Sequence, residues 1–346
     1  MSAETKEHFG NPLIEQRNLA EGKAAVNLGP RGVIAVSGED RLEWLHSLLS
    51  QNLANIETGQ SAEALLLDPQ GHIEQVIHFI DDGDASWLIV EAESKQALID
   101  WLIKMIFRKK VSVLDRSEDF VVIGHMGLGL DQAEVSNGTP LIWVDPWPGV
   151  VAGGVRYSMN RPASWHWTES LVPREKLVET LADYEPAGTA SAEALRIAAQ
   201  RPRQLTEVDD KALPHEFDWM STAVHMSKGC YRGQETVAKV HNLGHPPRRL
   251  TFLHLDGSGH FLPERGDEIF VSGDDRSRGK ITSVGQHFEM GPIALALLSR
   301  AVPEGAALVV RSQHGDIDAT QDVIVPASAG KAADLPKRNL LMGGGH

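Results

Sequence analysis

A single cysteine, Cys230, stands between two cations, Lys228 and Arg232, each two residues away. Positive charge beside a thiol favours the thiolate, which is both the nucleophilic and the metal-binding form. Gly229 and Gly233 allow tight turns or the close approach of a ligand. This spacing predicts a reactive thiol. The alternative is a small buried apolar residue, since free cysteine is often buried.

The residues that follow the cysteine predict the start of a helix. Gln234 and Glu235 would open it, and the exposed backbone N–H groups of a helix N-terminus attract anions. One cysteine excludes an intrachain disulfide, a four-cysteine zinc site and a self-contained iron–sulfur cluster. Any iron–sulfur chemistry would therefore involve a partner.

No metal site is predicted near this segment. His241 and His245 are four residues apart, as two ligands on a helix would be. Gly244 and the two prolines after His245 argue against a helix there. His241 is expected to lie near the site only because it follows the cysteine closely.

Composition narrows the class of protein. The chain has 346 residues, 42% of them hydrophobic and 23% charged, with a net charge of −14, which is an ordinary globular composition with room for two or three domains. The negative charge argues against a general grip on nucleic acid. The polar start and the lack of a long apolar run predict a cytoplasmic protein without a membrane partner.

Hydrophobic periodicity predicts a region of mixed helices and strands followed by a region of strands. The first part reads as strands and helices that favour an α+β, ferredoxin-like layering, with the strands at 64–67 and 73–80 joined as a hairpin through the turn Asp68–Gly71. Ser37 and Asp40 are expected to cap the helix that follows them. The other elements are strands at 32–37, 87–90, 111–114 and 120–123 and helices at 39–51, 95–108, 173–184 and 190–199.

After Pro247 short β-like runs are separated by Gly and Asp, which predicts a small β-sandwich or barrel. We therefore expect a region 1–240 with two α+β lobes, a β-barrel domain at 241–327 and a flexible, Gly-rich tail at 328–346.

The run KGCYRGQE at 228–235, followed by Lys239, His241 and LGHPPRRL, is similar to the signature of the YgfZ family. These are folate-binding proteins that support iron–sulfur enzymes, and they are related to the glycine-cleavage aminomethyltransferase. GVIAVSGEDRLEWLHSLLSQNLANIETGQ and GKITSVGQHFEMGPIALALL resemble the family's N-terminal and barrel regions. The resemblance implies the three-lobed aminomethyltransferase fold, two α+β lobes and a β-barrel around a central tetrahydrofolate site.

The resemblance also implies roles and partners. Cys230 would be the catalytic residue. Tetrahydrofolate or a derivative would be the cofactor, and the partners would be iron–sulfur client enzymes, including tRNA-modifying ones, with no direct nucleic acid. Near the motif, Lys239, Arg248 and Arg249 are either a solvated basic face or contacts for a folate glutamate tail. The predicted folate contacts are Lys228, Gly229, Tyr231, Arg232, Gln234, Glu235 and Arg249.

Departures from the aminomethyltransferase pattern weigh against that activity. Glu74 and Gln75 stand where that enzyme has an aspartate pair, and Ala198 stands where it has a pterin-binding glutamate, although Glu74 could replace an aspartate. Three hypotheses remain: an iron–sulfur accessory factor, a tetrahydrofolate-dependent aminomethyltransferase, and a non-catalytic folate module with a structural cysteine. Four tryptophans could stack on a pterin, but core packing is more common: Trp143, Trp147, Trp165 and Trp167.

Overall fold

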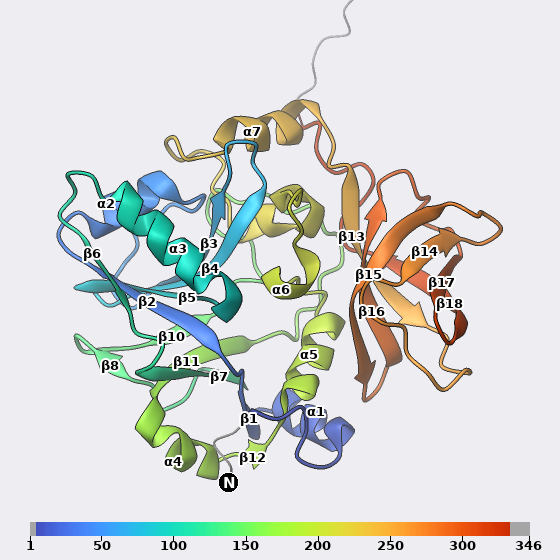
Figure 1. The fold of residues 1–346 in the computed structure, drawn as a ribbon, viewed down its shortest axis with the longest axis horizontal. Coiled ribbons are helices and arrows are strands. Elements are labelled where there is room, and N and C mark those ends of the chain that lie inside the picture. Colours follow the sequence, from blue (N-terminus) through green and yellow to red (C-terminus); the bar gives the residue numbers. More distant parts are fainter. Residues whose placement is uncertain (1–4, 333–346) are drawn as a thin grey trace, which may run out of the picture.

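The computed structural model describes residues 5–332, and within this range the strands form two five-stranded sheets, a closed barrel and a two-stranded ribbon (Figure 1). The first sheet has the order β3-β4-β5-β2-β6. Its strands are β2 (Arg31–Ser37), β3 (Ser61–Leu67), β4 (Ile73–Asp81), β5 (Ala85–Glu91) and β6 (Ser112–Asp115), and two helices, α2 (Arg41–Leu48) and α3 (Ala92–Met105), pack on it.

Alternation along β2 explains why this sheet is buried on both faces. Ile34 and Val36 pack beneath α2 and α3, whereas Val33 and Ala35 point into the central core. Successive side chains of a strand point to opposite faces. A strand covered on both sides therefore reads as a continuous apolar run, as β2 does.

The second sheet has the order β10-β11-β7-β1-β12 and lies on the other side of the central core (Figure 1). Val122 faces that core, while Val121 and Ile123 pack with Leu177 of the helix α4. The elements are β1 (Ala24–Asn27), β7 (Phe120–Met126), β10 (Ile142–Val144), β11 (Trp167–Pro173), β12 (Glu185–Pro186), the ribbon strands β8 (Val135–Ser136) and β9 (Thr139–Pro140), and the helices α1 (Pro12–Ala20), η1 (Arg174–Lys176), α4 (Leu177–Ala182) and α5 (Thr189–Ala198).

The barrel closes in the order β13-β16-β15-β14-β17-β18. Its strand β13 alternates between two cores, with Leu253 and Leu255 inside the barrel and Leu250 and Phe252 in the central core. This alternation joins the barrel to the rest of the molecule. The strands are β13 (Arg248–Leu255), β14 (Glu268–Val271), β15 (Ser277–His287), β16 (Gly291–Ser299), β17 (Leu308–Ser312) and β18 (Gly315–Val323).

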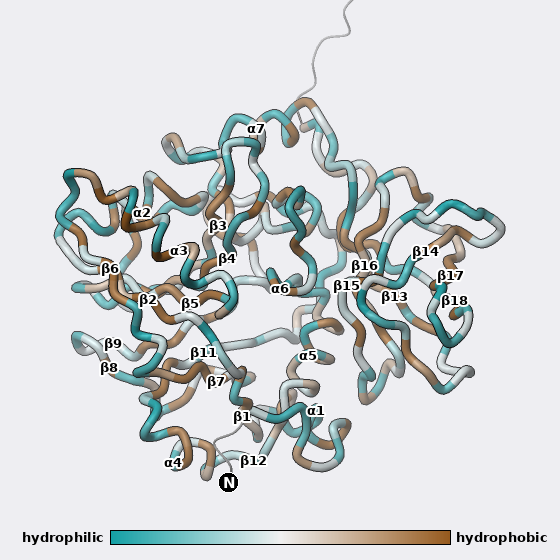
Figure 2. The backbone as a smooth tube through the Cα atoms, viewed as in Figure 1, coloured by the Kyte–Doolittle hydropathy of each residue, from teal (hydrophilic) through white to brown (hydrophobic). Residues whose placement is uncertain are grey.

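A largely buried connection runs between the second sheet and the barrel. It contains α6 (Gln204–Glu207), η2 (Pro214–Phe217), η3 (Trp219–Ser221) and α7 (Gln234–Leu243), and α7 lies beside the turn of the β3–β4 hairpin (Figure 1). Figure 2 shows apolar segments along the sheets and polar segments in the outer loops. Among residues 5–332 no helix has the length and apolarity needed to cross a bilayer.

The predicted α+β class with a late barrel is confirmed, and so is the β3–β4 hairpin. The helix cap was wrong, because the Asp40 carboxylate accepts from the backbone N–H of Lys110 and leaves α2 without a side-chain cap. The strand predicted at 120–123 belongs to the second sheet, since β7 pairs with β1 and β11. Sequence analysis missed α1, β1, β8 to β12, α6, η2, η3 and β18.

The domain boundaries at 240 and 327 stay a prediction. Of the predicted tail, residues 333–346 lie outside the described residues. The part that is described lies against α7, where the N–H of Ala332 donates to the carbonyl of His241 at 2.9 Å, and Nδ1 of His245 lies 2.8 Å from the carbonyl oxygen of Ala329.

Candidate functional site

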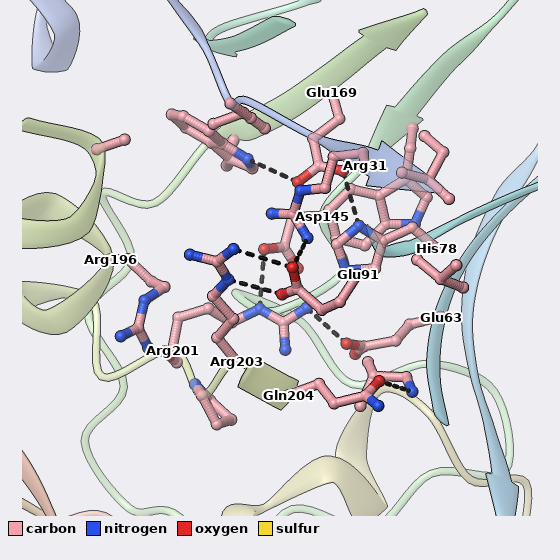
Figure 3. A pocket seen from close by; sticks show the side chains of 18 of the residues that line it. Arg31, Glu63, His78, Glu91, Asp145, Glu169, Arg196, Arg201, Arg203 and Gln204 are labelled. Carbon is pink, nitrogen blue, oxygen red and sulfur yellow. Dashed lines mark hydrogen bonds and ion pairs between the residues drawn. The ribbon is translucent and has the colours of Figure 1, made fainter. Parts of the chain in front are cut away.

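A pocket lies in the central core and is lined by both sheets, by α5 and by the segment 201–204 (Figure 3). Its cavity volume is about 90 Å³. Cavities that hold small organic ligands are typically about 300–1,000 Å³, so this cavity encloses only part of such a ligand. The pocket is a candidate site because charged and aromatic side chains from several elements converge on it.

The pocket is unusually rich in paired charges. Four arginines and five carboxylates line it, so cations and anions nearly balance. Buried charges are tolerated when each is paired and hydrogen-bonded. The arginines are Arg31, Arg196, Arg201 and Arg203, and the carboxylates are Glu63, Glu91, Asp145, Glu169 and Glu193.

Arg201 joins two of these carboxylates. Its Nη2 lies 2.6 Å from Glu63 Oε1, and its Nε lies 2.9 Å from Asp145 Oδ2. Burial raises the pKa of Asp145, and the nearby Arg201 opposes that rise. The Nη1 atom of Arg201 is buried and has no hydrogen-bond partner. Arg201 therefore has one buried donor that no described group satisfies.

Glu91 holds a second pair of arginines. Arg31 lies 2.8 Å from it, and Arg203 makes a bidentate pair at 2.6 and 2.9 Å. Burial alone would raise the pKa of Glu91, but the two guanidinium groups hold that pKa at about 2. The Nε atom of Arg31 is also buried without a partner. A second donor is thus left available beside a fully ionised carboxylate.

Tryptophans form flat walls. Trp143 stacks on His78 with ring centroids 3.6 Å apart and planes 3° apart, and Trp165 stacks on Trp167 at 5.2 Å. Sequence analysis left these tryptophans unassigned; all three line the pocket. Flat aromatic faces suit a planar heterocycle, and the charged groups around them can select its polar edges.

The segment 228–235 lies elsewhere, and none of its residues lines the pocket. The ammonium of Lys228 is buried and donates to the backbone carbonyls of His46, Leu49 (2.5 Å) and Gln51 (3.0 Å). These carbonyls lie in or just after the last turn of α2, whose negative end favours a cation. Burial lowers the pKa of Lys228 to about 8. Lys228 thus ties the segment to α2.

Cys230 is exposed and carries the thiol at the surface of the segment. Arg232, the second flanking cation, makes a bidentate ion pair with Glu74 at 2.7 and 3.1 Å and lies over the ring of Trp101. Both cations that the sequence placed beside the thiol are therefore committed to other groups. The catalytic role of Cys230 stays a prediction.

The rest of the segment packs on the β3–β4 hairpin. Gly233 has φ +82°, and a Cβ there would lie 2.6 Å from the carbonyl oxygen of Asp68, so only glycine fits. The predicted helix begins at Gln234 as α7, while Glu235 is exposed. Tyr231 is buried in the central core, and burial raises the pKa of its hydroxyl.

Arg249, predicted to contact a folate tail, does not reach the pocket. It is fully buried on β13, where it donates to Thr251 at 2.8 Å and to Gln321 at 2.9 Å. Strand alternation is the reason, because its side chain points into the barrel with Thr251. Arg248 pairs instead with the exposed Asp209 and with the buried Glu216.

Sequence analysis missed most of the pocket. Arg201 and Arg203 lie in a stretch that reads as irregular and polar, and their partners come from strands up to 138 residues away. The sequence did contain one signal. Arg196, Arg201 and Arg203 fall within eight residues, and where such a segment is buried its cations need buried counter-charges. Within residues 5–332 no group of three or more His, Cys, Asp or Glu side chains is placed to hold a metal ion.

Comparison with solved structures places this fold. The aminomethyltransferase T of the glycine cleavage system from Bartonella henselae superposes with a TM-score of 0.70 over 92% of this chain and 89% of that one, at 19% identity. The molecule therefore has the three-lobed aminomethyltransferase fold that the sequence predicted.

Comparison of sequences shows which proteins this chain is similar to. A chloroplastic Arabidopsis thaliana protein named as a transferase is 25% identical over 80% of this chain, and the mitochondrial iron–sulfur cluster assembly factor IBA57 homologue of Mycosarcoma maydis is 23% identical over 64%. This chain spans 65% and 55% of their respective lengths. The tRNA-modifying protein YgfZ of Vibrio atlanticus is 23% identical over 82% of this chain and 86% of its own. No family model matches.

The chain is thus a relative of the YgfZ and IBA57 proteins, a group that is itself related to aminomethyltransferase, and the predicted resemblance is confirmed.

Proposed function

We propose that this protein binds tetrahydrofolate, or a derivative of it, in the central pocket and supports the assembly or repair of iron–sulfur clusters in client enzymes, tRNA-modifying enzymes among them. The observation that carries the proposal is the pocket itself, which combines stacked tryptophans with paired arginines and carboxylates on an aminomethyltransferase fold. The names of the IBA57 and YgfZ relatives support the client side.

The chemistry of the pocket fits a folate. A reduced pterin is a flat ring with N–H donors on its edge. Tryptophan faces can stack on such a ring, and carboxylates can accept hydrogen bonds from its N–H groups. The glutamate end of a folate carries carboxylates, which suit guanidinium groups. Arg31 and Arg201 each have a buried nitrogen without a partner, and a ligand oxygen that entered between them and their neighbours could accept from it.

Cys230 has a separate place in the proposal. Its thiol is exposed and lies outside the pocket lining, so a partner protein can reach it while folate is bound. We place the contact with clients at the segment 228–235. The predicted folate contacts of this segment stay a prediction, and Lys228 and Arg232 are engaged with α2 and Glu74.

Folate binding is tested by blocking the pocket. Thr189 lines it at the start of α5, whereas the neighbouring Ala190 is exposed and does not. We expect 5-formyltetrahydrofolate to bind the wild-type protein in isothermal titration calorimetry. Thr189→Trp should weaken binding at least tenfold, and Ala190→Trp should leave it unchanged. A wild-type protein that binds no reduced folate would refute the proposal.

The client role is tested in cells that depend on this protein. We expect Cys230→Ala to lower the activity of iron–sulfur enzymes under oxidative stress, at equal protein abundance. Ser227→Ala, an exposed change on the same loop, is the control. Unchanged enzyme activities in the Cys230→Ala strain would remove Cys230 from the proposal.

Aminomethyl transfer remains the rival activity because carboxylates do line the pocket, although Glu74 and Gln75 are not among them. Incubation with an aminomethylated lipoyl carrier protein and tetrahydrofolate decides between the two. Formation of methylene-tetrahydrofolate would favour the transferase. We further propose a cytoplasmic location. Two relatives have chloroplastic and mitochondrial names, so the location needs its own test, and a fluorescent fusion provides it.

A further inference from the structure

His78 is held in the pocket wall by contacts on two sides. Its Nδ1 lies 2.8 Å from Glu169 Oε2, and its ring stacks flat on Trp143 at 3.6 Å. Trp143 is itself fully buried and fixed by a 2.8 Å hydrogen bond from its indole N–H to the carbonyl of Ala62. The imidazole therefore has little freedom to rotate.

The contact with Glu169 sets the tautomer of this imidazole. Glu169 is buried, and although burial alone would raise the pKa of its carboxyl, His78, Arg31 and the Trp167 indole hold that pKa at about 2. An ionised carboxylate only accepts hydrogen bonds, so Nδ1 of His78 carries the proton. The Nε2 atom is then a bare acceptor or, in the imidazolium, a donor.

Nε2 of His78 is open to the pocket. No described residue is bonded to it, and it is not among the polar atoms that are buried without a partner. His78 lines the pocket, as Figure 3 shows beside Glu169. A histidine oriented by a carboxylate, with its far nitrogen facing a ligand cavity, is the arrangement of an acid–base group.

Charged groups surround His78 on every side of the pocket. Glu169 on β11 contacts His78 directly, and Asp145 after β10 lies close enough for the two charges to interact. The other charged groups that line the pocket are Arg31 on β2, Glu63 on β3, Glu91 at the end of β5, Glu193 and Arg196 on α5, and Arg201 and Arg203 after α5.

We propose that His78, oriented by Glu169 and stacked on Trp143, is an acid–base group that exchanges a proton with a ring nitrogen of the ligand in the central pocket. The proton leaves Nε2 of the imidazolium for the nitrogen lone pair and leaves a neutral imidazole whose Nδ1–H still donates to Glu169. The reverse transfer restores the imidazolium. The identity of the ligand as a reduced folate rests on the proposed function.

The dyad is tested first without ligand, by the ¹⁵N chemical shifts of the histidine side chains between pH 4 and pH 9, with His78→Gln to assign the signal. We expect a neutral form protonated on Nδ1. Glu169→Gln, which keeps the shape of the side chain, should raise the share of the form protonated on Nε2, because an amide can donate as well as accept. A neutral form protonated on Nε2 in the wild type, or a tautomer ratio that Glu169→Gln leaves in place, overturns the proposal.

Proton exchange with the ligand is tested by anaerobic calorimetry of tetrahydrofolate binding in buffers of different ionisation enthalpy, because N5 of tetrahydrofolate keeps the lone pair that a formyl group would engage. We expect wild-type binding to take up or release a fraction of a proton, and His78→Gln to lower that number at least twofold. His72→Gln is the matched control, because His72 lies on the same hairpin, pairs with Asp68 at 2.9 Å and does not line the pocket.

Equal proton exchange in the wild type and His78→Gln overturns the proposal. Absence of folate binding by the wild type refutes the proposed function instead, and the tautomer of His78 and its change in Glu169→Gln then decide on the dyad by themselves.

Discussion

The segment 228–235 and the central pocket use charge in opposite ways. In the segment, Lys228 and Arg232 are each tied to groups on neighbouring elements, and the remaining reactive group is an exposed thiol. In the pocket, arginines and carboxylates are buried together and still leave donors without partners. The segment therefore resembles an attachment surface, and the pocket resembles a binding site prepared for a polar ligand.

This difference separates two properties that the sequence had merged. The folate contacts were predicted in the segment 228–235 because its motif is distinctive. Its cations, Lys228 and Arg232, bond to groups of the neighbouring elements. The groups suited to a folate come from segments that carry no short motif.

Removal of Arg201 should cost the most. Arg201→Met leaves Glu63 and Asp145 buried without their cation. Breaking a buried pair in this way typically costs about 3–5 kcal/mol in the free energy of unfolding. Urea unfolding at pH 7 measures it. A loss below about 1 kcal/mol would mean that the pocket charges are solvated, which contradicts their burial.

The next effect is a pH dependence near α7. His215 is fully buried, its Nε2 lies 3.0 Å from the carbonyl oxygen of Val237, and burial lowers its pKa from 6.5 to about 4. Between these values the unfolded chain binds the proton and the folded chain does not, so stability rises with pH. We expect the wild type to lose roughly 2–3 kcal/mol between pH 7 and pH 4.5 from this group alone.

His215→Gln removes the titrating group and should flatten that slope in urea unfolding. The low pKa values of Glu91 and Glu169, both about 2, place their loss of stability between pH 4.5 and pH 2, outside this window. An equal slope in the wild type and the variant would assign the pH dependence to other groups.

Lys228→Met tests the structural role given to the motif lysine. The change leaves the carbonyls of His46, Leu49 and Gln51 without their charged donor. Hydrogen bonds to charged groups contribute about 1.5–3 kcal/mol, so we expect a loss of about 2 kcal/mol in the free energy of unfolding. Lys239→Met, an exposed change on α7, should have no measurable effect. Equal stability of the two variants would free Lys228 for a role in binding.

Much of the fold was predictable because it depends on local patterns. The alternation in Gly32–Ser37 and the turn chemistry of Asp68–Gly71 were enough to place β2 and the β3–β4 hairpin. Strand β18 was missed because only Ile317 and Ala319 of its nine residues are buried, so its pattern is mostly polar.

The pocket was not predictable for a different reason. Its ion pairs join residues far apart in sequence, such as Arg201 with Glu63, and no local pattern encodes such a pairing. The direction of Arg249 was also hidden, since one residue of register decides whether a strand side chain enters the barrel or faces the central core. For Cys230 the motif could be recognised from the local sequence, but the exposure of its thiol became known only from the fold.

Arg232→Ala should have a small effect. Its ion pair with Glu74 lies at the surface, with 30% and 38% of the two side chains exposed. Such pairs contribute about 0–1 kcal/mol, and salt screens them. We expect a loss below about 1 kcal/mol that shrinks further in 0.5 M NaCl. A loss of unfolding free energy as large as that of Arg201→Met would mean that the Arg232–Glu74 pair behaves like the buried ion pairs of the pocket.

Cys230→Ser should change the folded protein least. The thiol is exposed, so the free energy of unfolding should stay within about 0.5 kcal/mol of the wild type. The thiol of the native wild type should react fully with a small disulfide reagent. Since Cys230 does not line the pocket, the affinity for 5-formyltetrahydrofolate should stay within twofold. A tenfold weaker affinity in Cys230→Ser would join the segment and the pocket into one site, because an exposed thiol can affect a distant ligand only if the two surfaces close on each other.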